Sequence, residues 1–154
     1  MIWNFVNIFS NLISVCISSS FNWFNFEESN HHYVNKYNDI EIDEYSFNYA
    51  KFTYKDGAVY YGEFIQPATR EGLGQMNYAN EEIFYGQFRN DKRNGKGRSI
   101  YTNGDKYTGE FVNDNRDGEG VYCYISGNVY KGMFVKGKKH GKGEFVNGKT
   151  KEHY

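Results

Sequence analysis

The sequence contains one proline, Pro67, and two cysteines, Cys16 and Cys123, among 154 residues. The cysteines lie far apart and form neither a metal-binding spacing nor a disulfide framework, so we expect a reducing, cytoplasmic location. Positive charge is not in excess either, because 18 Lys and Arg oppose 19 Asp and Glu for a net charge of -1. A chain without a global basic field is not expected to have a nucleic-acid partner.

Glycine and aromatic residues are abundant instead, and they are regularly spaced. The chain has 17 Gly, 15 Tyr and 13 Phe, and regular spacing of these residue types is typical of repeat proteins. The pattern Y-x-x-G-x-x-Y-x-G-x-F occurs four times, and one copy has Glu81 for the first glycine and Phe84 for the second tyrosine. The copies span Tyr54–Phe64, Tyr78–Phe88, Tyr101–Phe111 and Tyr124–Phe134.

Pairs of glycines separate the copies at a constant interval. Each pair has the form G-x-G, and the second glycines are each 23 positions apart. Only the stretch from Phe64 to Gly74 is one residue longer, and it contains Pro67. A fixed period of this length predicts a stack of equivalent structural units. The pairs are Gly72 and Gly74, Gly95 and Gly97, Gly118 and Gly120, and Gly141 and Gly143.

The spacing within one copy predicts a β-hairpin. Tyr107, Gly109 and Phe111 are two positions apart, so their side chains share one face of a strand. The strand before them ends at Tyr101, and the turn between the two strands is TNGD. Asn-Gly turns are typical of hairpins because both residues accept a positive φ. A helix is not expected, since glycine at this density is too unfavourable in helix interiors.

Successive hairpins are expected to stack, because a single hairpin is only marginally stable. Stacking places equivalent aromatic side chains in three columns on one face. Four glycines fall between two aromatics on that face, where a side chain would push the rings apart. The columns are Tyr54, Tyr78, Tyr101 and Tyr124; Tyr60, Phe84, Tyr107 and Tyr130; and Phe64, Phe88, Phe111 and Phe134; the glycines are Gly62, Gly86, Gly109 and Gly132.

These units resemble the MORN repeat, the membrane occupation and recognition nexus motif. The segments GKGRSIYTNGDKYTGEF and GEGVYCYISGNVYKGMF match its pattern of paired glycines followed by Tyr, Gly, Tyr, Gly and Phe. The resemblance covers about residues 50–148, and we expect a repeat domain over 50–154 with four full repeats and a terminal half-repeat. It implies a mostly β fold, an elongated single-layer meander of stacked β-hairpins. It also implies use as a scaffold or binding module.

The first 26 residues carry no charged side chain, and they predict an N-terminal α-helix. Polar residues recur every three or four positions and trace one stripe of a helix, opposite an apolar face. Three interpretations remain open: a helix packed on the repeats or on a partner, a membrane-inserted or signal segment, and a disordered start. The polar stripe consists of Asn4, Asn7, Asn11, Ser14 and Ser18.

Residues 27–49 are acidic and then alternate in polarity. Tyr45, Phe47 and Tyr49 are separated by Ser46 and Asn48. Alternation of this kind predicts a strand that leads into the first repeat. We therefore expect either an acidic linker or a degenerate capping strand here.

The stretch GEFVNGKT, Gly143–Thr150, has the letters of a nucleotide-binding phosphate loop. Such a loop needs a helix behind it, whose amides and dipole hold the phosphates. Only KEHY follows Thr150, and Gly143 already belongs to the 23-residue register. We therefore interpret the stretch as a strand and an Asn-Gly turn, and expect no nucleotide and no other cofactor.

Catalytic and metal-binding residues are not expected. The four histidines do not cluster by spacing, and a metal site needs three or four convergent ligands. The connectors between copies are expected to be polar loops along one edge of the stack. Two basic runs occupy equivalent connectors, so we expect them along that edge, as a solvated edge or as contacts to an anionic surface. They consist of Lys92, Arg93, Lys96 and Arg98, and of Lys136, Lys138, Lys139 and Lys142.

The function expected from the sequence is a non-catalytic scaffold that binds protein partners, including other copies of itself as a homo-oligomer. The aromatic groove or the ends of the stack would supply the contacts. The alternative is a peripheral membrane protein that is held on anionic lipids by the N-terminal helix and the basic edge.

Overall fold

The computed structural model describes residues 33–34, 40–42, 49–65 and 68–154. The chain divides into two compact units, Met1–Asn30 and His31–Tyr154, and all described residues belong to the second. The helix predicted for residues 1–26 therefore lies outside the described residues, as does most of the acidic segment. In the described part of the chain, no helix has the length and apolar character that crossing a membrane requires.

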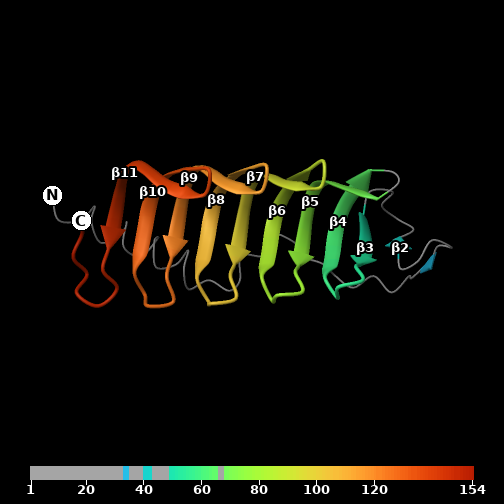
Figure 1. Ribbon diagram of the computed structural model, residues 1–154, viewed down its shortest axis with the longest axis horizontal. Coiled ribbons are helices and arrows are strands. Elements are labelled where there is room, and N and C mark those ends of the chain that lie inside the picture. Colours follow the sequence, from blue (N-terminus) through green and yellow to red (C-terminus); the bar gives the residue numbers. More distant parts are fainter. Residues whose placement is uncertain (1–32, 35–39, 43–48, 66–67) are drawn as a thin grey trace, which may run out of the picture. The chain divides into compact units, whose positions relative to one another are not determined.

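The described residues form strands that pair in chain order in one antiparallel sheet (Figure 1). Two short strands precede the repeats, and nine further strands follow as a continuous meander, which confirms the predicted mostly β fold and the hairpin units. The strands are β1 (Tyr33–Val34), β2 (Ile40–Ile42), β3 (Tyr49–Thr53), β4 (Val59–Ile65), β5 (Thr69–Asn77), β6 (Ile83–Arg89), β7 (Lys92–Ile100), β8 (Lys106–Val112), β9 (Asn115–Cys123), β10 (Val129–Val135) and β11 (Lys138–Val146).

The turn after each odd-numbered strand from β3 to β9 closes around a residue with positive φ. In the turn between β7 and β8, the N–H of Gly104 donates to the carbonyl of Tyr101 over 2.8 Å. Gly104 has φ of 85°, and Gly57 and Gly127 occupy the same position in their repeats. Glu81 takes this position in the turn between β5 and β6 with φ of 68°, where an L side chain is strained.

The connectors that follow the even-numbered strands are shorter than the connectors that the sequence predicts. Asn90 and Asp91 both have positive φ and form a two-residue turn, and Asn113 and Asp114 repeat it. Strand pairing begins directly after each turn, so the segments expected to be polar loops are the first parts of nine-residue strands. The loop prediction was wrong because Asn and Asp tolerate the left-handed region, which allows a tight turn without glycine.

A row of glycines crosses the sheet where the strands bend. Gly97, for example, pairs with Gly86 on one side and with Gly109 on the other. A Cβ atom on Gly97 would lie 2.5 Å from the Phe84 ring, so the ring covers the glycine backbone directly. The glycines thus make room for a ring that lies over them. The second glycine of each G-x-G pair makes this room in the same way as the glycine between two aromatics.

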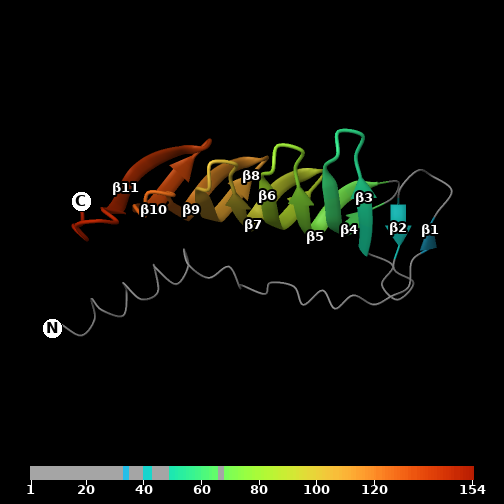
Figure 2. The same ribbon diagram turned by 90° about the horizontal axis from the view of Figure 1, so that it is seen from below.

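The first glycine of each pair has a different role, because it lies in a β-bulge. Gly95 has φ of 99° and falls where the pairing of β6 with β7 shifts register. Bulges bend and twist strands. Figures 1 and 2 show the ends of the longer strands turned away from the plane of the rest of the sheet. The bend encloses the aromatic side chains on one face.

The core is a continuous zigzag of aromatic rings within this bend. Phe84 meets Phe88 and Phe111 edge to face, with ring centroids 5.1 Å apart in both pairs. Tyr107 continues the row by contacting Phe111 and Phe134 at 5.2 and 5.1 Å. Because each ring touches rings of the neighbouring repeat, the repeats stabilise one another.

Cys123 lies on the other face of the sheet, where it is 8% exposed.

Candidate functional site

The three aromatic columns lie at different depths. In the middle and third columns every ring is buried, and Tyr60, Phe84 and Tyr107 have no exposed surface. The hydroxyls of Tyr60 and Tyr107 donate to the carbonyls of Glu63 and Glu110 over 2.6 and 3.0 Å. The first column is half-buried or exposed: Tyr54 is 37% exposed, and Tyr78, Tyr101 and Tyr124 are intermediate. This column is the part of the aromatic surface that a partner can reach.

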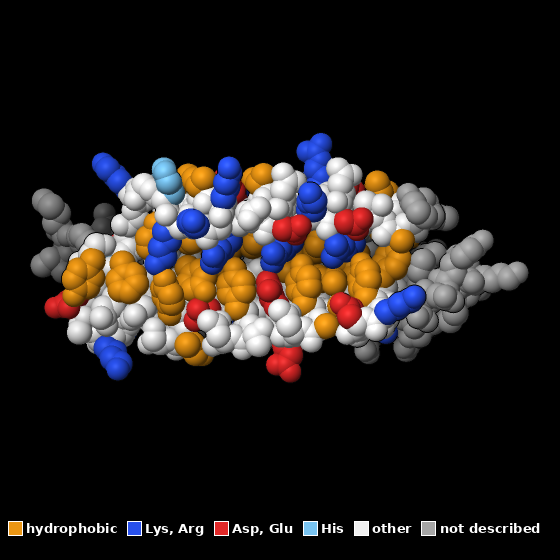
Figure 3. All heavy atoms as spheres, in the orientation of Figure 1, with side chains coloured by type: hydrophobic (Ala, Val, Ile, Leu, Met, Phe, Trp, Pro, Cys, Tyr) orange, Lys and Arg blue, Asp and Glu red, His pale blue; other side chains and the backbone are white. Residues whose placement is uncertain are grey.

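Further rings extend the reachable surface toward the end of the sheet. Tyr122 stacks on Tyr101 at 5.9 Å and contacts Tyr124 at 4.7 Å. Phe145 follows at 6.3 Å from Tyr124. Figure 3 shows these rings as an apolar row along one face, with Lys and Arg side chains directly beside it. Tyr122 and Phe145 were not among the predicted ring positions. Tyr122 is two positions from Tyr124, and it pairs with the ring-face residues Tyr107 and Tyr130.

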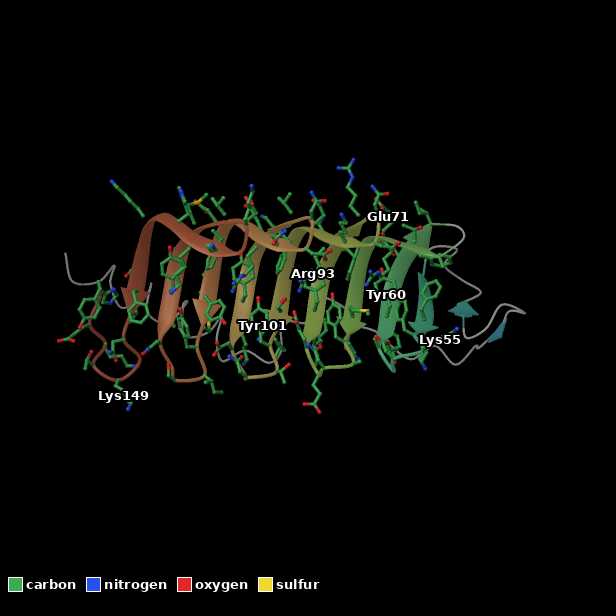
Figure 4. All side chains as sticks on the ribbon, in the orientation of Figure 1. Lys55, Tyr60, Glu71, Arg93, Tyr101 and Lys149 are labelled. Atoms are coloured by element: carbon green, nitrogen blue, oxygen red, sulfur yellow. The ribbon has the colours of Figure 1, made fainter. Side chains whose placement is uncertain are left out.

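Four cations at 23-residue intervals form a second column beside the rings: Arg70, Arg93, Arg116 and Lys139. The guanidinium carbon of Arg93 lies 5.6 and 5.3 Å from the ring centres of Phe84 and Phe111. Arg116 and Lys139 lie over the corresponding rings of the next two repeats. Figure 4 shows Arg93 on the same face as Tyr60 and Tyr101. We call these four residues the cation column.

Sequence reasoning identified Arg93 and Lys139 only as members of basic runs, and it missed Arg70 and Arg116. The signal was available, because the four residues share the 23-residue interval of the glycines. It was overlooked because the prediction considered clusters of positive charge, whereas this column has one cation in each repeat.

The first two cations of the column are paired with carboxylates. Arg70 Nε lies 3.2 Å from Asp91 Oδ1. Arg93 lies 2.9 Å from Glu82 and 3.4 Å from Asp114. The aspartates belong to the turn of the following repeat, so these pairs also connect one repeat to the next. Because the partners are partly exposed, each pair is a modest contribution to stability.

The last two cations contact neutral oxygen atoms. Gly137 occupies the turn position that holds Asp91 and Asp114 in the preceding repeats, and Arg116 donates to its carbonyl over 2.7 Å. Lys139 donates to the hydroxyl of Tyr124 over 2.5 Å. Among the described residues, neither Arg116 nor Lys139 has a carboxylate oxygen within 4.0 Å. The first two cations of the column are therefore paired with carboxylates, and the last two are not.

One buried carboxylate, Asp105, lies near this end of the column. Its oxygens accept hydrogen bonds from the Ile125 N–H at 2.8 Å, the Tyr122 hydroxyl at 2.8 Å and the Asn103 amide at 2.9 Å. Burial alone raises the pKa of Asp105, but these three hydrogen bonds outweigh it, so the pKa lies below its ordinary value. Asp105 thus stays ionised and is held by neutral donors rather than by a cation.

Two tyrosines of this face, Tyr107 and Tyr122, have pKa values above the ordinary value. Burial raises the pKa of Tyr107 above its ordinary value. For Tyr122, burial and then the hydrogen bond to Asp105 raise the pKa. The face therefore offers aromatic rings, neutral hydroxyl groups and fixed positive charges to a partner.

The side chains of the eight predicted basic residues do not share one face of the sheet. Arg93 and Lys139 belong to the cation column on the ring face. Lys136 lies in a turn. The remaining five each lie next to a residue of the ring face. Because successive side chains of a strand point to opposite faces, these five point to the opposite face of the sheet. These five are Lys92, Lys96, Arg98, Lys138 and Lys142. The basic residues near these turns are therefore divided between the two faces of the sheet.

The stretch Gly143–Thr150 forms the end of β11 and a turn. Gly143 pairs with Gly132 in the glycine row. The amides of Lys149 and Thr150, which a phosphate loop would direct at its ligand, donate to the side chain of Asn147 over 2.9 and 3.2 Å. The remaining residues return along β11, and Val146 pairs with His153. The amides of this segment are therefore used within the protein.

No three acidic, histidine or cysteine side chains gather into a metal-binding group anywhere in the described part of the chain. His153 contacts Glu144. Sequence comparison identifies the repeats: the family model of the MORN repeat matches residues 84–106, 107–129 and 130–150. Each match begins at a ring of the middle column, Phe84, Tyr107 or Tyr130. No curated protein matches the chain.

Proposed function

We propose that this MORN-repeat protein is a non-catalytic scaffold whose ring face binds protein partners. MORN repeats are generally modules for protein or membrane interaction. The observation that carries the proposal is the half-exposed row of Tyr78, Tyr101, Tyr122 and Tyr124 beside the cation column. Tyrosine and arginine are the residue types that contribute most to binding energy at protein interfaces.

The two faces of the sheet differ in a way that favours the ring face. Its rings are held rigidly by neighbouring rings and by the cation column, so a partner orders few side chains when it binds. The opposite face carries a mixture of charges, such as Lys96 facing Glu110 and Lys131 facing Glu144. Such mixed, solvated surfaces are depleted at interface cores.

We also propose that the ring face does not catalyse a reaction. The carboxylates of the ring face are occupied: Glu82 pairs with Arg93, and Asp105 accepts three hydrogen bonds. Asp105 has a lowered pKa, which makes it a poor general base near neutral pH. These groups fit structural roles in linking turns and strands.

Peripheral membrane binding is the second candidate, and the exposed lysines of the last repeat favour it. Lys136, Lys138 and Lys142 are all exposed. Each lysine near an anionic bilayer would contribute about 1 kcal/mol. The predicted helix at residues 1–26 would add an apolar anchor. A cytoplasmic location, in part at the membrane, is proposed with this candidate.

Affinity capture with matched variants tests the proposal. The intact chain is compared with a Tyr101→Ser and Tyr124→Ser double variant, which removes two reachable rings. A Tyr61→Ser and Tyr85→Ser double variant is the control, because these tyrosines lie on the opposite face. We expect captured proteins to be lost with the first variant and kept with the control.

Equal capture by both variants, with both folded by circular dichroism, would contradict binding through the ring face. Sedimentation with anionic vesicles tests the second candidate in parallel. If deletion of residues 1–26 together with neutralisation of Lys136, Lys138 and Lys142 leaves vesicle binding unchanged, the membrane candidate fails.

A further inference from the structure

The cation column is neutralised at one end and not at the other. Arg70 and Arg93 have carboxylate partners within 3.4 Å. Arg116 and Lys139 hydrogen-bond to a backbone carbonyl and to a phenol. The difference traces to one turn position, where the aspartate of two successive repeats is replaced by Gly137.

Both unneutralised cations contact aromatic rings, Arg116 as a partly buried side chain and Lys139 as an exposed one. The Arg116 guanidinium carbon is 5.8 and 5.2 Å from the ring centres of Tyr101 and Tyr122. The Lys139 ammonium is 5.1 and 4.4 Å from those of Tyr124 and Tyr130. The cation–ring contacts fix the position of each charge but do not neutralise it. A carboxylate that approaches Arg116 meets a donor in partly desolvated surroundings, where a charged hydrogen bond is strong. A carboxylate that approaches Lys139 meets an exposed donor that is positioned by its ring contacts.

We propose that Arg116 and Lys139 form a carboxylate-binding subsite on the ring face, and that its ligand is an acidic peptide segment of a protein partner. The inference rests on the proposed function and adds the chemistry of the partner. Arg116 would bind one Asp or Glu side chain and Lys139 another, while apolar side chains of the same segment pack on Tyr101, Tyr122 and Tyr124. Charge complementarity is the reason to assign an acidic partner to this end of the face.

The repeat geometry sets the spacing of the two carboxylates. The cations are one two-stranded repeat apart, which is about 10 Å along the sheet. Three residues of an extended chain span about 10 Å, and seven residues of a helix span about the same distance. We therefore expect acidic residues three apart in a ligand with polyproline II conformation, which returns to the same side every three residues, or seven apart on one side of a helical ligand.

The chain itself offers a substitution that closes the subsite without removing a residue from it. Gly137→Asp restores the aspartate of the other repeats at a position where nothing lies within 4 Å of an added Cβ. Its φ of 80° is close to the 65° and 68° of Asp91 and Asp114, so aspartate is compatible with the turn. The new carboxylate would neutralise Arg116 within the protein, as Asp114 neutralises Arg93.

The test is selection of a display library of random linear peptides on the full-length chain, followed by titration of the selected peptides against variants. Gly137→Asp and Lys139→Gln each change the net charge by one and act on the subsite. Lys138→Gln makes the same change outside the ring face and is the matched control. We expect selected peptides to carry Asp or Glu at the spacing above. They should bind about tenfold more weakly to either subsite variant, and within about twofold of the original affinity to the control.

Three other outcomes are decisive. Peptides that lose binding with Tyr101→Ser, but lack acidic residues or bind Gly137→Asp equally well, would overturn the subsite and leave the proposed function standing. Peptides that are indifferent to Tyr101→Ser would contradict the proposed function itself. If Gly137→Asp instead abolishes sedimentation with phosphatidylcholine–phosphatidylserine vesicles and no selected peptide is acidic, the ligand is a lipid headgroup and the peptide assignment is wrong.

Discussion

The two ends of the ring face share one framework but differ in charge. Around Phe84, Arg93 lies over the rings and contacts Glu82 and Asp114. Around Tyr107, Arg116 lies over equivalent rings, yet its hydrogen bond goes to the carbonyl of Gly137. The backbone link between repeats is the same in both, since Asp114 N–H donates to Arg93 O and Gly137 N–H donates to Arg116 O.

This comparison separates what builds the fold from what is available for binding. The glycine row, the bulges and the buried rings recur in every repeat, so they are needed wherever a hairpin stacks on another. The carboxylates around the cation column recur only in part, since Asp91 and Asp114 are equivalent and Gly137 takes their place in the next turn. We propose that this variable position adjusts which partner the ring face binds. The predictions below test that separation.

The largest effect is expected from truncating the buried rings. Tyr107→Ala and Phe84→Ala should each lower the free energy of unfolding by about 3 to 5 kcal/mol, because both rings are fully buried in the same zigzag. Chemical denaturation followed by circular dichroism measures both. A loss below about 0.5 kcal/mol for Tyr107→Ala would mean that the ring faces solvent.

The next prediction distinguishes the two ends of the cation column. Arg93→Met should cost about 2 kcal/mol, because Glu82 and Asp114 lose their partner while Met retains the packing on the rings. Arg116→Met should cost about 1 kcal/mol, since it leaves no carboxylate unpaired. The same denaturation measurement applies, and a larger loss for Arg116→Met would contradict the assigned difference.

The third prediction concerns acid stability at the unneutralised end. The pKa of Asp105 is lower in the folded chain than its ordinary value of 3.8. Its hydrogen bonds therefore stabilise the fold above that pH, and the stabilisation is lost as pH falls through the lower, folded pKa. Asp105→Asn should cost about 1 kcal/mol at neutral pH. Unfolding free energies measured from pH 7 downward should fall less steeply with acid for the variant than for the original chain. An unchanged slope would show that Asp105 does not contribute to the acid dependence of stability.

A small gain is expected from repairing one turn. Glu81→Gly should stabilise the chain by about 1 kcal/mol, because Glu81 has φ of 68° where the equivalent residues are glycines. The melting temperature of the variant measures this gain. Gly104→Ala, the reverse change in the following repeat, is the matched control and should lower it.

The sequence was sufficient for the repeat, and the reason is its regularity. The interval of Gly74, Gly97, Gly120 and Gly143, together with the strand alternation around Tyr107, predicted the meander and the ring columns. The role of the paired glycines could not be predicted from the sequence, because the distance from Gly97 to the Phe84 ring depends on how the strand bends. Sequence spacing carries no information on that bend.

The binding face was only partly predictable. Periodicity identified the rings but not their depth, so Tyr54 and Tyr101 could not be distinguished from Tyr60 and Tyr107 before the structure. The connectors were expected to be loops, which misplaced the basic residues. The partners of Arg93, Asp114 and Glu82, come from two other turns, and such pairs follow from three-dimensional packing rather than from spacing.

The central claim is that partners bind the ring face, and an NMR titration tests it most directly. Backbone amide shifts of the intact chain are followed while a captured partner, or a selected peptide, is added. The account predicts the largest shifts at Tyr101, Arg116, Tyr124 and Lys139. Shifts confined to the opposite face, at Tyr61, Tyr85 and Lys131, or to residues 1–26, would contradict it.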